Sequence, residues 1–244
     1  MRRNLKIAFV AAGTALALAS SPALASTTFD AFTSFNGAQG AGNFTYGSVD
    51  DGVVAGTLFT ANTNCFIDNS ICLQAAPNHD VPGVTKSATP SLQYGSVNVP
   101  TDRLLLHPGS IAANGGVFIT FTAPTTSVYK YDASFSIQDL RPSGVTVIFR
   151  QQSGSAPASF FGGATLGADN LTYSNSGFVT LNAGDVFSTV INRDGSYFND
   201  STGENFTLTA VPEPTTWAML LLGFGMVGLG LRGRRKATVR VAGA

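Results

Sequence analysis

The sequence has little charge and few of the side chains that most often carry catalysis. Asp, Glu, Lys and Arg make up 11% of the 244 residues, and only two histidines are present. Hydrolysis by a serine nucleophile needs a histidine and a carboxylate beside it, and the chain has no G-x-S-x-G sequence. His107 lies in a Leu-His-Pro-Gly turn sequence and His79 in a Pro-Asn-His-Asp turn sequence. We therefore expect a protein without enzymatic activity.

Glutamate is equally scarce, which limits the side chains that could form a catalytic pair of carboxylates. Glu204 and Glu213 are the two glutamates of the chain, and Glu213 lies close to the C-terminus. Cleavage of a glycosidic bond normally uses two Asp or Glu side chains that flank it. Aspartates such as Asp132 and Asp139 would have to supply this pair, so a hydrolase is the alternative to a protein without activity.

Basic residues are sparse between the two ends of the chain. Residues 26–210 contain six Lys or Arg residues against thirteen Asp or Glu residues, a net charge of −7. Binding to nucleic acid or to another polyanion requires a basic patch. This acidic region therefore argues against nucleic acid as a partner.

Residues 1–25 have the regions of a secretory signal peptide. Basic residues within the first six positions precede an apolar stretch at residues 7–18, and an Ala-Leu-Ala sequence ends at Ala25. This pattern predicts export and cleavage between Ala25 and Ser26. Arg2 and Arg3 faintly resemble a twin-arginine signal, but nothing in the sequence suggests a cofactor loaded before export, so Sec export is favoured.

The other end of the chain has a long uncharged segment. Residues 215–231 contain no charged side chain, and an α-helix that spans a membrane needs roughly 17–25 apolar residues. A soluble helix of this length would show a polar stripe at the helical period, and none is present. We expect a single C-terminal transmembrane helix at about residues 215–231.

A basic cluster after this segment sets its orientation. Lys and Arg close to a span stay on the cytoplasmic side. Residues 26–210 should therefore lie outside, and residues 237–244 should form a cytoplasmic tail. The cluster consists of Arg232, Arg234, Arg235 and Lys236.

A short motif precedes the uncharged segment. Pro212, Glu213, Pro214, Trp217 and Ala218 spell PEPxxWA, and the apolar stretch and the basic cluster follow. Residues 211–236 closely resemble the PEP-CTERM sorting signal of exported envelope and biofilm proteins of Gram-negative bacteria. The resemblance implies that exosortase, a membrane-embedded cysteine peptidase, recognises these residues and processes the chain near them. The alternative is a plain C-terminal anchor behind a proline-rich linker.

Cys65 and Cys72 are the two cysteines of the chain, and export places them in an oxidising compartment. A bond between them closes a ring of about eight residues, for which the chain-entropy model predicts about 2.5 kcal/mol of stabilisation. A metal site is the alternative, but two thiols and His79 do not complete a closed zinc site. We predict a structural disulfide.

A strict alternation of apolar and polar residues is the clearest sign of the fold. Apolar side chains occupy every second position from Tyr129 to Ile137, which predicts a strand with one buried face. Similar alternation predicts strands at residues 117–121 and 145–149, and we expect these three strands to form an antiparallel meander. Short apolar stretches predict further strands at residues 29–35, 44–46, 53–59, 171–173, 178–181, 186–192 and 205–210.

About ten short strands without an amphipathic helix predict an all-β fold for residues 26–210, an antiparallel β-sandwich or barrel. Parts of residues 103–210 resemble the galactose-binding-like jelly rolls of envelope proteins and of modules beside carbohydrate-active enzymes. The resemblance implies a jelly-roll sandwich, a fold that supports many functions.

The segment Asp194–Thr202 contains side chains suited to a ligand. Asp194, Asn199 and Asp200 offer hard oxygen ligands for calcium, although their spacing differs from that of an EF-hand loop. The alternative is a long hairpin turn, where Asp and Asn are common because they tolerate turn geometry. Tyr197 and Phe198 offer ring faces on which a sugar could stack.

These features predict an exported protein of the cell envelope or the exopolysaccharide matrix, with a structural, adhesive or carbohydrate-binding sandwich. We expect Sec export, anchoring in the inner membrane through the C-terminus, and delivery to the envelope or matrix after processing. The expected partners are the membrane, exosortase and an exopolysaccharide. The alternative is a secreted hydrolase that acts on matrix polysaccharide.

Overall fold

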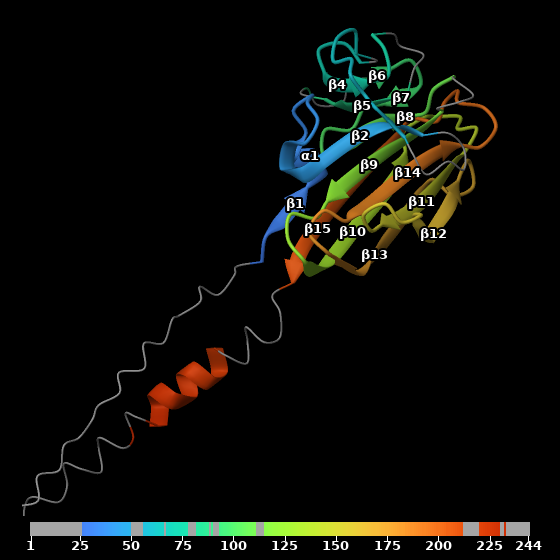
Figure 1. The fold of residues 1–244 in the computed structure, drawn as a ribbon. Coiled ribbons are helices and arrows are strands. Elements are labelled where there is room, and N and C mark those ends of the chain that lie inside the picture. The colour runs from blue at the N-terminus through green and yellow to red at the C-terminus, as the bar shows by residue number, and fades with distance from the viewer. Residues whose placement is uncertain are drawn as a thin grey trace, which may run out of the picture. The chain divides into compact units, whose positions relative to one another are not determined.

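Two antiparallel β-sheets packed face to face form the body of the protein (Figure 1). The computed structural model describes residues 26–49, 56–65, 67–77, 82–87, 89, 93–110, 115–211, 220–229 and 232. The chain divides into two units, residues 25–219 and a second unit that holds the helix at residues 220–229. The prediction of an all-β antiparallel sandwich is confirmed.

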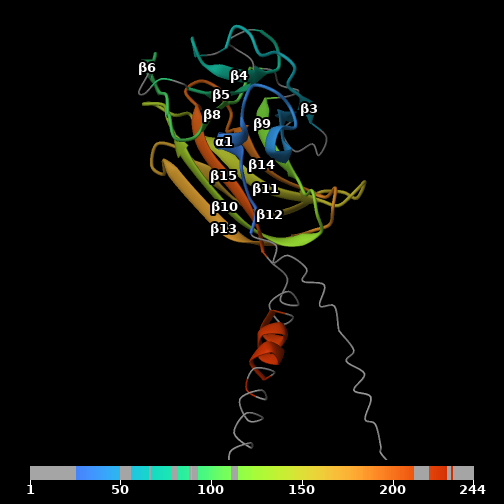
Figure 2. The ribbon, with the colours of Figure 1, turned by 90° about the vertical axis from the view of Figure 1, so that its left-hand side faces the viewer.

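The first sheet has seven strands and the second has six. In spatial order the first contains β13 (Thr172–Leu181), β10 (Ser127–Ile137), β15 (Thr202–Val211), β8 (Leu104–His107), β5 (Gly83–Lys86) and β4 (Ile71–Gln74), with β1 (Thr28–Asp30) paired to β15. The second contains β12 (Ser159–Leu166), β11 (Val145–Gln152), β14 (Val186–Arg193), β9 (Gly116–Thr122), β2 (Phe44–Val49) and β3 (Thr57–Leu58). Figure 2 shows β13, β10 and β15 side by side in the first sheet.

Three smaller elements complete the described part of the body. A separate two-stranded sheet contains β6 (Gln93–Tyr94) and β7 (Val97–Asn98). The helix α1 (Ala31–Ser34) follows β1 directly, and the 3-10 helix η1 (Ala41–Asn43) precedes β2. Lys86 on β5 holds α1 in place, because its ammonium donates to the carbonyl of Phe32 at 2.6 Å and lies 4.5 Å from the centre of the Phe32 ring.

The alternation predicted for β10 is present. Every second residue from Tyr129 to Ile137 is buried, and the residues between them are partly or fully exposed. The buried set packs against side chains of the second sheet; for example, the Tyr131 ring lies 4.9 Å from that of Phe187 on β14. Aromatic rings from both sheets therefore fill the interior between them.

The predicted meander of three consecutive strands is wrong. β10 lies in the first sheet between β13 and β15, whereas β9 and β11 lie in the second sheet on either side of β14. Ile119 on β9 and Phe149 on β11 both pair with Thr189 of β14. Alternation identifies the buried face of each strand but not its neighbours, because both sheets bury one face in the same core.

Two other strand predictions need correction. The strand predicted at residues 29–35 ends at Asp30, whose carboxylate caps α1 by accepting hydrogen bonds from the backbone N–H and the hydroxyl of Thr33 at 3.1 and 3.0 Å. The strands predicted at residues 171–173 and 178–181 are one strand, β13, which pairs with β10 along its whole length. The sequence did not predict β4, β5, β8 or β12 as strands.

The predicted disulfide between Cys65 and Cys72 is present, with 5.6 Å between the two Cα atoms. Cys72 is buried on β4, and Cys65 lies in the preceding loop. Gln74 supports the same loop, since its side-chain amide donates to the carbonyls of Thr63 and Asn64 at 3.0 and 2.9 Å. The bond therefore fastens this loop to the edge strand of the first sheet.

A buried carboxyl group lies inside the sandwich. Glu204 on β15 is 1% exposed and faces the second sheet, where the hydroxyl of Thr189 donates to its Oε1 at 2.5 Å. Its Oε2 has no hydrogen-bond partner among the described residues. Burial raises the pKa of Glu204 to about 8, although the bond from Thr189 opposes this shift. The folded protein therefore holds this proton more tightly than the unfolded chain does.

The helix at residues 220–229 covers part of the predicted transmembrane segment. Most of its apolar side chains are exposed, including Leu221 and Phe224, each 70% exposed. The rest of the predicted span, residues 215–219 and 230–231, lies outside the described residues. Among the residues that the structure describes, no helix is both long and apolar enough to cross a membrane.

Removal of the disulfide should destabilise the body without unfolding it. We expect the double variant Cys65→Ala/Cys72→Ala to lose about 2.5 kcal/mol, which corresponds to roughly 5–10 °C in melting temperature for a domain of this size. Circular dichroism should show an unchanged β-sheet spectrum at 25 °C, because the core between the sheets does not involve Cys65. The wild-type chain in reductant is the control and should shift equally; an unchanged melting temperature in both would contradict a stabilising role.

Glu204 should make the protein more stable in mild acid than in mild base. The stability that the protonated Glu204 side chain contributes is complete below 4.5, the pKa of this group in the unfolded chain. It is lost as the pH rises toward about 8, the pKa of the same group in the folded protein. We expect a loss on the order of a few kcal/mol across this range, measured as denaturant midpoints at pH 5 and pH 8. Glu204→Gln should abolish most of the difference, whereas the exposed control Asp132→Asn should retain it. Equal pH dependence in wild type and Glu204→Gln would refute this assignment.

Candidate functional site

Three neighbouring strands of the first sheet turn a polar surface to solvent. β10 pairs with β13 on one side and with β15 on the other, and residues that pair across strands share a face. Asp132, for example, lies between Ser176 of β13 and Thr207 of β15. We call this surface the polar face. Its members are Lys130, Asp132, Ser134, Ser136, Thr172, Ser174, Ser176, Asn205, Thr207 and Thr209.

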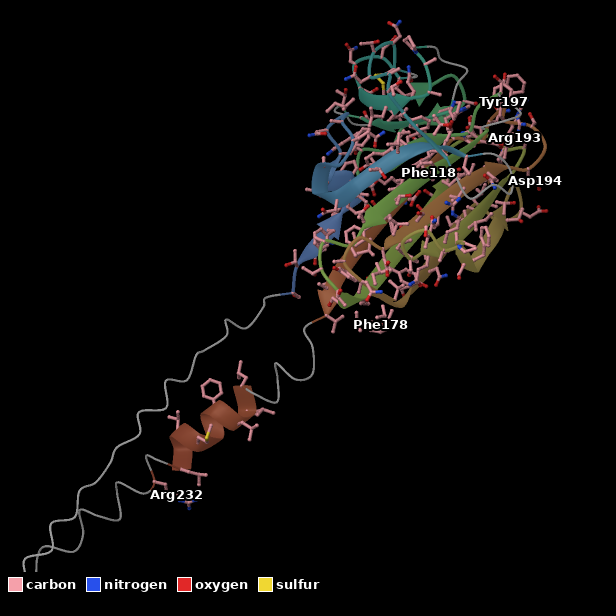
Figure 3. The ribbon with its side chains drawn as sticks, viewed as in Figure 1. Phe118, Phe178, Arg193, Asp194, Tyr197 and Arg232 are labelled. Atoms are coloured by element: carbon pink, nitrogen blue, oxygen red, sulfur yellow. A yellow bond between two sulfur atoms is a disulfide. The ribbon has the colours of Figure 1, made fainter. Side chains whose placement is uncertain are left out.

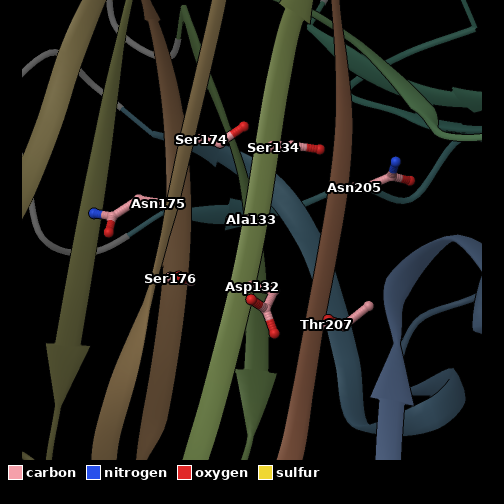
Figure 4. Close-up of a pocket in the computed structure, with 8 residues that line it drawn as sticks. All are labelled: Asp132, Ala133, Ser134, Ser174, Asn175, Ser176, Asn205 and Thr207. Atoms are coloured by element: carbon pink, nitrogen blue, oxygen red, sulfur yellow. The ribbon is translucent and has the colours of Figure 1, made fainter.

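The middle of the polar face contains a hollow of about 350 Å³ (Figure 4). The outward side chains that line it carry hydroxyl groups, one amide and one carboxylate, so it can both donate and accept hydrogen bonds. Ala133 and Asn175 also border it, although they alternate with the outward residues of their strands. The outward side chains around the hollow are Asp132, Ser134, Ser174, Ser176, Asn205 and Thr207.

An exposed aromatic ring lies at one end of the polar face. Phe178 on β13 is 68% exposed and pairs with Lys130 of β10. The ammonium of Lys130 lies 2.9 Å from a carboxylate oxygen of Asp132. Both charged side chains are about half exposed, so this pair contributes little to stability, but it leaves the polar face locally neutral.

Arg103 borders the opposite end of the polar face. The Arg103 side chain packs against Gly203 of β15. A Cβ atom added to this glycine would lie 2.6 Å from the Arg103 Cδ. Its guanidinium donates to the hydroxyl of Ser136 at 3.2 Å and to both carboxylate oxygens of Asp102 at 3.0 and 2.8 Å. The bonds from Arg103 lower the pKa of Asp102. A second hollow of about 400 Å³ extends the face here and is lined by Asn98, Val99, Pro100, Thr101, Asp102, Arg103, Ser136 and Gln138.

Small apolar clusters cover other outward surfaces of the sandwich. Leu105 of β8 points away from the main core and is buried in a cluster with Ile67, Val97 and Val99. On the second sheet, Phe118 of β9 is buried in a cluster with Val49 and Val190. The polar face has no such cover among the described residues, and it is therefore our candidate site.

The predicted aromatic pair lies elsewhere. Figure 3 shows Tyr197 and Asp194 at the end of the sandwich opposite to Phe178. The rings of Tyr197 and Phe198 stack on each other, with 4.2 Å between their centres and 30° between their planes. Phe198 is nevertheless 60% exposed. Each ring thus covers one face of the other, and sugar binding by this pair stays a prediction.

Asp200 connects two loops by hydrogen bonds. Its side chain is buried, and its Oδ1 accepts hydrogen bonds from the hydroxyl of Ser143 at 2.8 Å and the backbone N–H of Gly144 at 2.9 Å. Burial raises the pKa of Asp200 to about 6, the two hydrogen bonds oppose this shift, and nearby Asp139 adds to it. The loop before β11 is thereby tied to the loop before β15.

The other two predicted calcium ligands are exposed. Asp194 points to solvent, and the side-chain oxygen of Asn199 lies 3.2 Å from the hydroxyl oxygen of Ser96. Across the ranges that the structure describes, no group of three or more His, Cys, Asp or Glu side chains could hold a metal ion. Calcium binding by this loop stays a prediction.

The aspartate pair suggested for glycoside cleavage does not form. Asp132 lies on the polar face, whereas Asp139 is buried beyond the end of β10 and accepts hydrogen bonds from Ser96 and the backbone N–H of Ser201. At about 3.3 Å per residue the two lie roughly 20 Å apart, whereas the carboxylates of glycosidases lie within about 10 Å of each other. This pair cannot flank one glycosidic bond.

Most residues of the predicted processing sites lie outside the described part of the chain. They are Ala25, Pro212, Glu213, Pro214, Trp217, Ala218, Arg234, Arg235 and Lys236. Ser26 and Arg232 are described, and both are exposed. The described strand β15 ends at Val211, the residue before Pro212 in the sequence, and the backbone N–H of Ala210 donates to the carbonyl of Thr27 at 2.9 Å.

Sequence reasoning missed the polar face as a site. The outward residues of β10 were identified only as a water-facing set. The signal that could have found the face is the continuation of the same small polar residues at alternate positions, from Thr172 to Ser176 and from Asn205 to Thr209. The exposed Phe178 interrupts that pattern with a ring that the core does not use.

Several solved structures are similar to the chain at low identity. A structure titled "CBM4 structure and function" is 12% identical, with a TM-score of 0.33, and the match covers 62% of this chain and all of that one. The K2 cleaved adhesin domain of Lys-gingipain is 11% identical, with a TM-score of 0.33 and coverage of 77% and 98%. The N-terminal cellulose-binding domain of Cellulomonas fimi β-1,4-glucanase C is 12% identical, with a TM-score of 0.29 and coverage of 76% and 95%. All three TM-scores lie below 0.5, so these likenesses carry no argument about function.

The sequence comparisons concern the C-terminal segment. No curated protein matches the chain. Residues 210–236 match the family model of the PEP-CTERM protein-sorting motif, which covers the whole segment that the PEPxxWA residues, the uncharged stretch and the basic cluster had indicated. The chain therefore carries a PEP-CTERM protein-sorting motif, as its sequence predicted.

Proposed function

We propose that this protein is exported, sorted by exosortase through residues 210–236, and delivered to the cell envelope or the exopolysaccharide matrix. The match of these residues to the PEP-CTERM motif carries the proposal. Pro212, Glu213 and Pro214 serve as the element that the peptidase recognises. The basic residues after the span hold the C-terminus in the cytoplasm until processing.

The described helix supports a membrane-anchored precursor. Six large apolar side chains between Leu221 and Leu229 are at least half exposed. Exposed apolar surface of this extent is costly in water and favourable in lipid. We assign the span to residues 215–231 and the signal peptide to residues 1–25, with Sec export and anchoring in the inner membrane before processing.

Both predicted processing sites adjoin one strand pair. β1 begins two residues after Ser26, and β15 ends at the residue before Pro212. Thr28 pairs with Thr209, and their hydroxyls lie 2.9 Å apart. Cleavage at either site therefore removes a terminal segment without cutting into the sandwich.

The strand order supports a jelly roll for the body. Of the strands from β8 to β15, four lie in the first sheet in the order β8, β15, β10, β13, and four in the second in the order β9, β14, β11, β12. The first and last strands of the set are neighbours, and the chain crosses between sheets repeatedly, which is the arrangement of a double-sheet jelly roll. We assign this body a structural, adhesive or carbohydrate-binding role without an enzymatic step.

Replacement of the motif should block processing. In cells with a matching exosortase, the triple substitution of Pro212, Glu213 and Pro214 by alanine should abolish the shorter product and leave full-length precursor in the membrane fraction. Immunoblots of membrane and culture-supernatant fractions measure this. The matched control is Thr215→Ala/Thr216→Ala, which changes only the two variable positions of PEPxxWA and should be processed normally. If the triple variant matches wild type in mobility and fractionation, the segment is a plain anchor.

A further inference from the structure

The polar face combines three properties that bear on ligand binding. It has a large exposed aromatic ring, Phe178, at one end. It has a hollow lined by hydroxyl, amide and carboxylate groups in the middle. It has a second polar hollow beyond Ser136. A face that only contacts water needs neither an exposed phenyl ring nor a depression.

We propose that the polar face binds a neutral polysaccharide, with Phe178 as the stacking platform and the hollow around Asp132 and Asn205 as the hydrogen-bonding subsite. This inference rests on the proposed function, because delivery to the matrix brings the protein to such a ligand. It assigns ligand binding to the sheet rather than to the loop that contains Tyr197 and Phe198.

The chemistry of the face suits a sugar. A pyranose ring has an apolar face of C–H groups, which packs on an aromatic ring, and a rim of hydroxyl groups that both donate and accept hydrogen bonds. Asp132 accepts, Asn205 donates and accepts, and the Ser and Thr hydroxyls do either. Binding sites of this kind join one apolar contact to several fixed polar groups.

The charge of the face selects a neutral ligand. Lys130 and Asp132 neutralise each other at 2.9 Å, and Arg103 is likewise paired with Asp102 at 2.8 Å. The remaining members of the face carry no charge. Residues 26–210 together carry a net charge of −7, which repels a polyanionic chain.

The dimensions of the face suit a chain rather than a single sugar. Phe178 of β13 lies beside Lys130 of β10, and Ser136 lies near the far end of β10. From Lys130 to Ser136 the strand rises roughly 20 Å, at about 3.3 Å per residue. The second hollow continues past Ser136 toward Asn98 and Thr101. Several linked sugar rings can therefore lie along β10, each over a row of cross-strand polar residues.

Phe198, which lies next to Tyr197 in a loop, offers a matched comparison with Phe178. Phe198 is 60% exposed, close to the 68% of Phe178, but it stacks on Tyr197, which lies at the end of the sandwich opposite to Phe178 (Figure 3). If exposed aromatic area alone caused binding, the two phenylalanines would contribute equally. The proposal requires Phe178 and not Phe198, because Phe178 pairs with Lys130 and so lies on the same sheet face as the polar groups of the hollow.

Binding by the full-length chain tests the proposal. The protein is purified in a zwitterionic detergent, which has no sugar head group to compete, and is titrated calorimetrically with hydroxyethylcellulose, dextran, galactomannan and the anionic alginate. We expect binding to at least one neutral polymer and none to alginate. Phe178→Ala and Asn205→Ala should each weaken it at least tenfold, whereas Phe198→Ala should leave it unchanged. Melting temperatures equal to that of wild type show that the variants are folded.

Three results would overturn the inference: binding to none of the neutral polymers, binding to alginate alone, or loss of binding in Phe198→Ala but not in Phe178→Ala. None of these results affects the proposed sorting, which is tested separately, by fractionation. Phe178→Ala should be processed and released as wild type is. If the protein is sorted normally but binds no neutral polymer, the proposed function still holds and only the assignment of ligand binding to the polar face is wrong.

Discussion

The antiparallel pairing of β15 is the interaction on which the rest of the structure depends. This strand pairs with β10 from Val128 to Ile137, with β8 beside its first residues and with β1 beside its last residues. It therefore joins the N-terminal, middle and C-terminal parts of the body in one sheet. Its inward residues Phe206 and Leu208 enter the core, while Asn205 and Thr207 form part of the polar face. One strand thus couples the stability of the sandwich to its candidate binding surface.

Local patterns in the sequence predicted the buried faces of strands well but predicted the neighbours of those strands poorly. The alternation from Tyr129 to Ile137 gave the buried face of β10 because the side-chain period of a strand is a local property. The partners of β10 are β13 and β15, the latter more than sixty residues further along the chain. Each strand of the predicted meander had an equally apolar face, so nothing local distinguished the two sheets. Only the long-range registers decide between them.

The two candidate sites differ in predictability for the same reason. The sorting motif is a contiguous sequence, and its order and spacing sufficed to identify it. The polar face is assembled from β13, β10 and β15, so its members became a site only once the registers placed Asp132 beside Thr207 and Lys130 beside Phe178. Glu204 was missed as a buried group because the strand predicted there began at Asn205, one residue after Glu204, whereas β15 begins at Thr202, three residues before Asn205.

The boundary between the body and the motif follows from the chemistry of one residue. Val211 closes the ladder opposite Val128, and the hydroxyl of Ser127 donates to its carbonyl at 3.3 Å. Pro212 follows in the sequence and has no backbone N–H to donate to a ladder, and β15 as described ends at Val211. The processing proposed above would therefore remove residues on which no described sheet pairing depends.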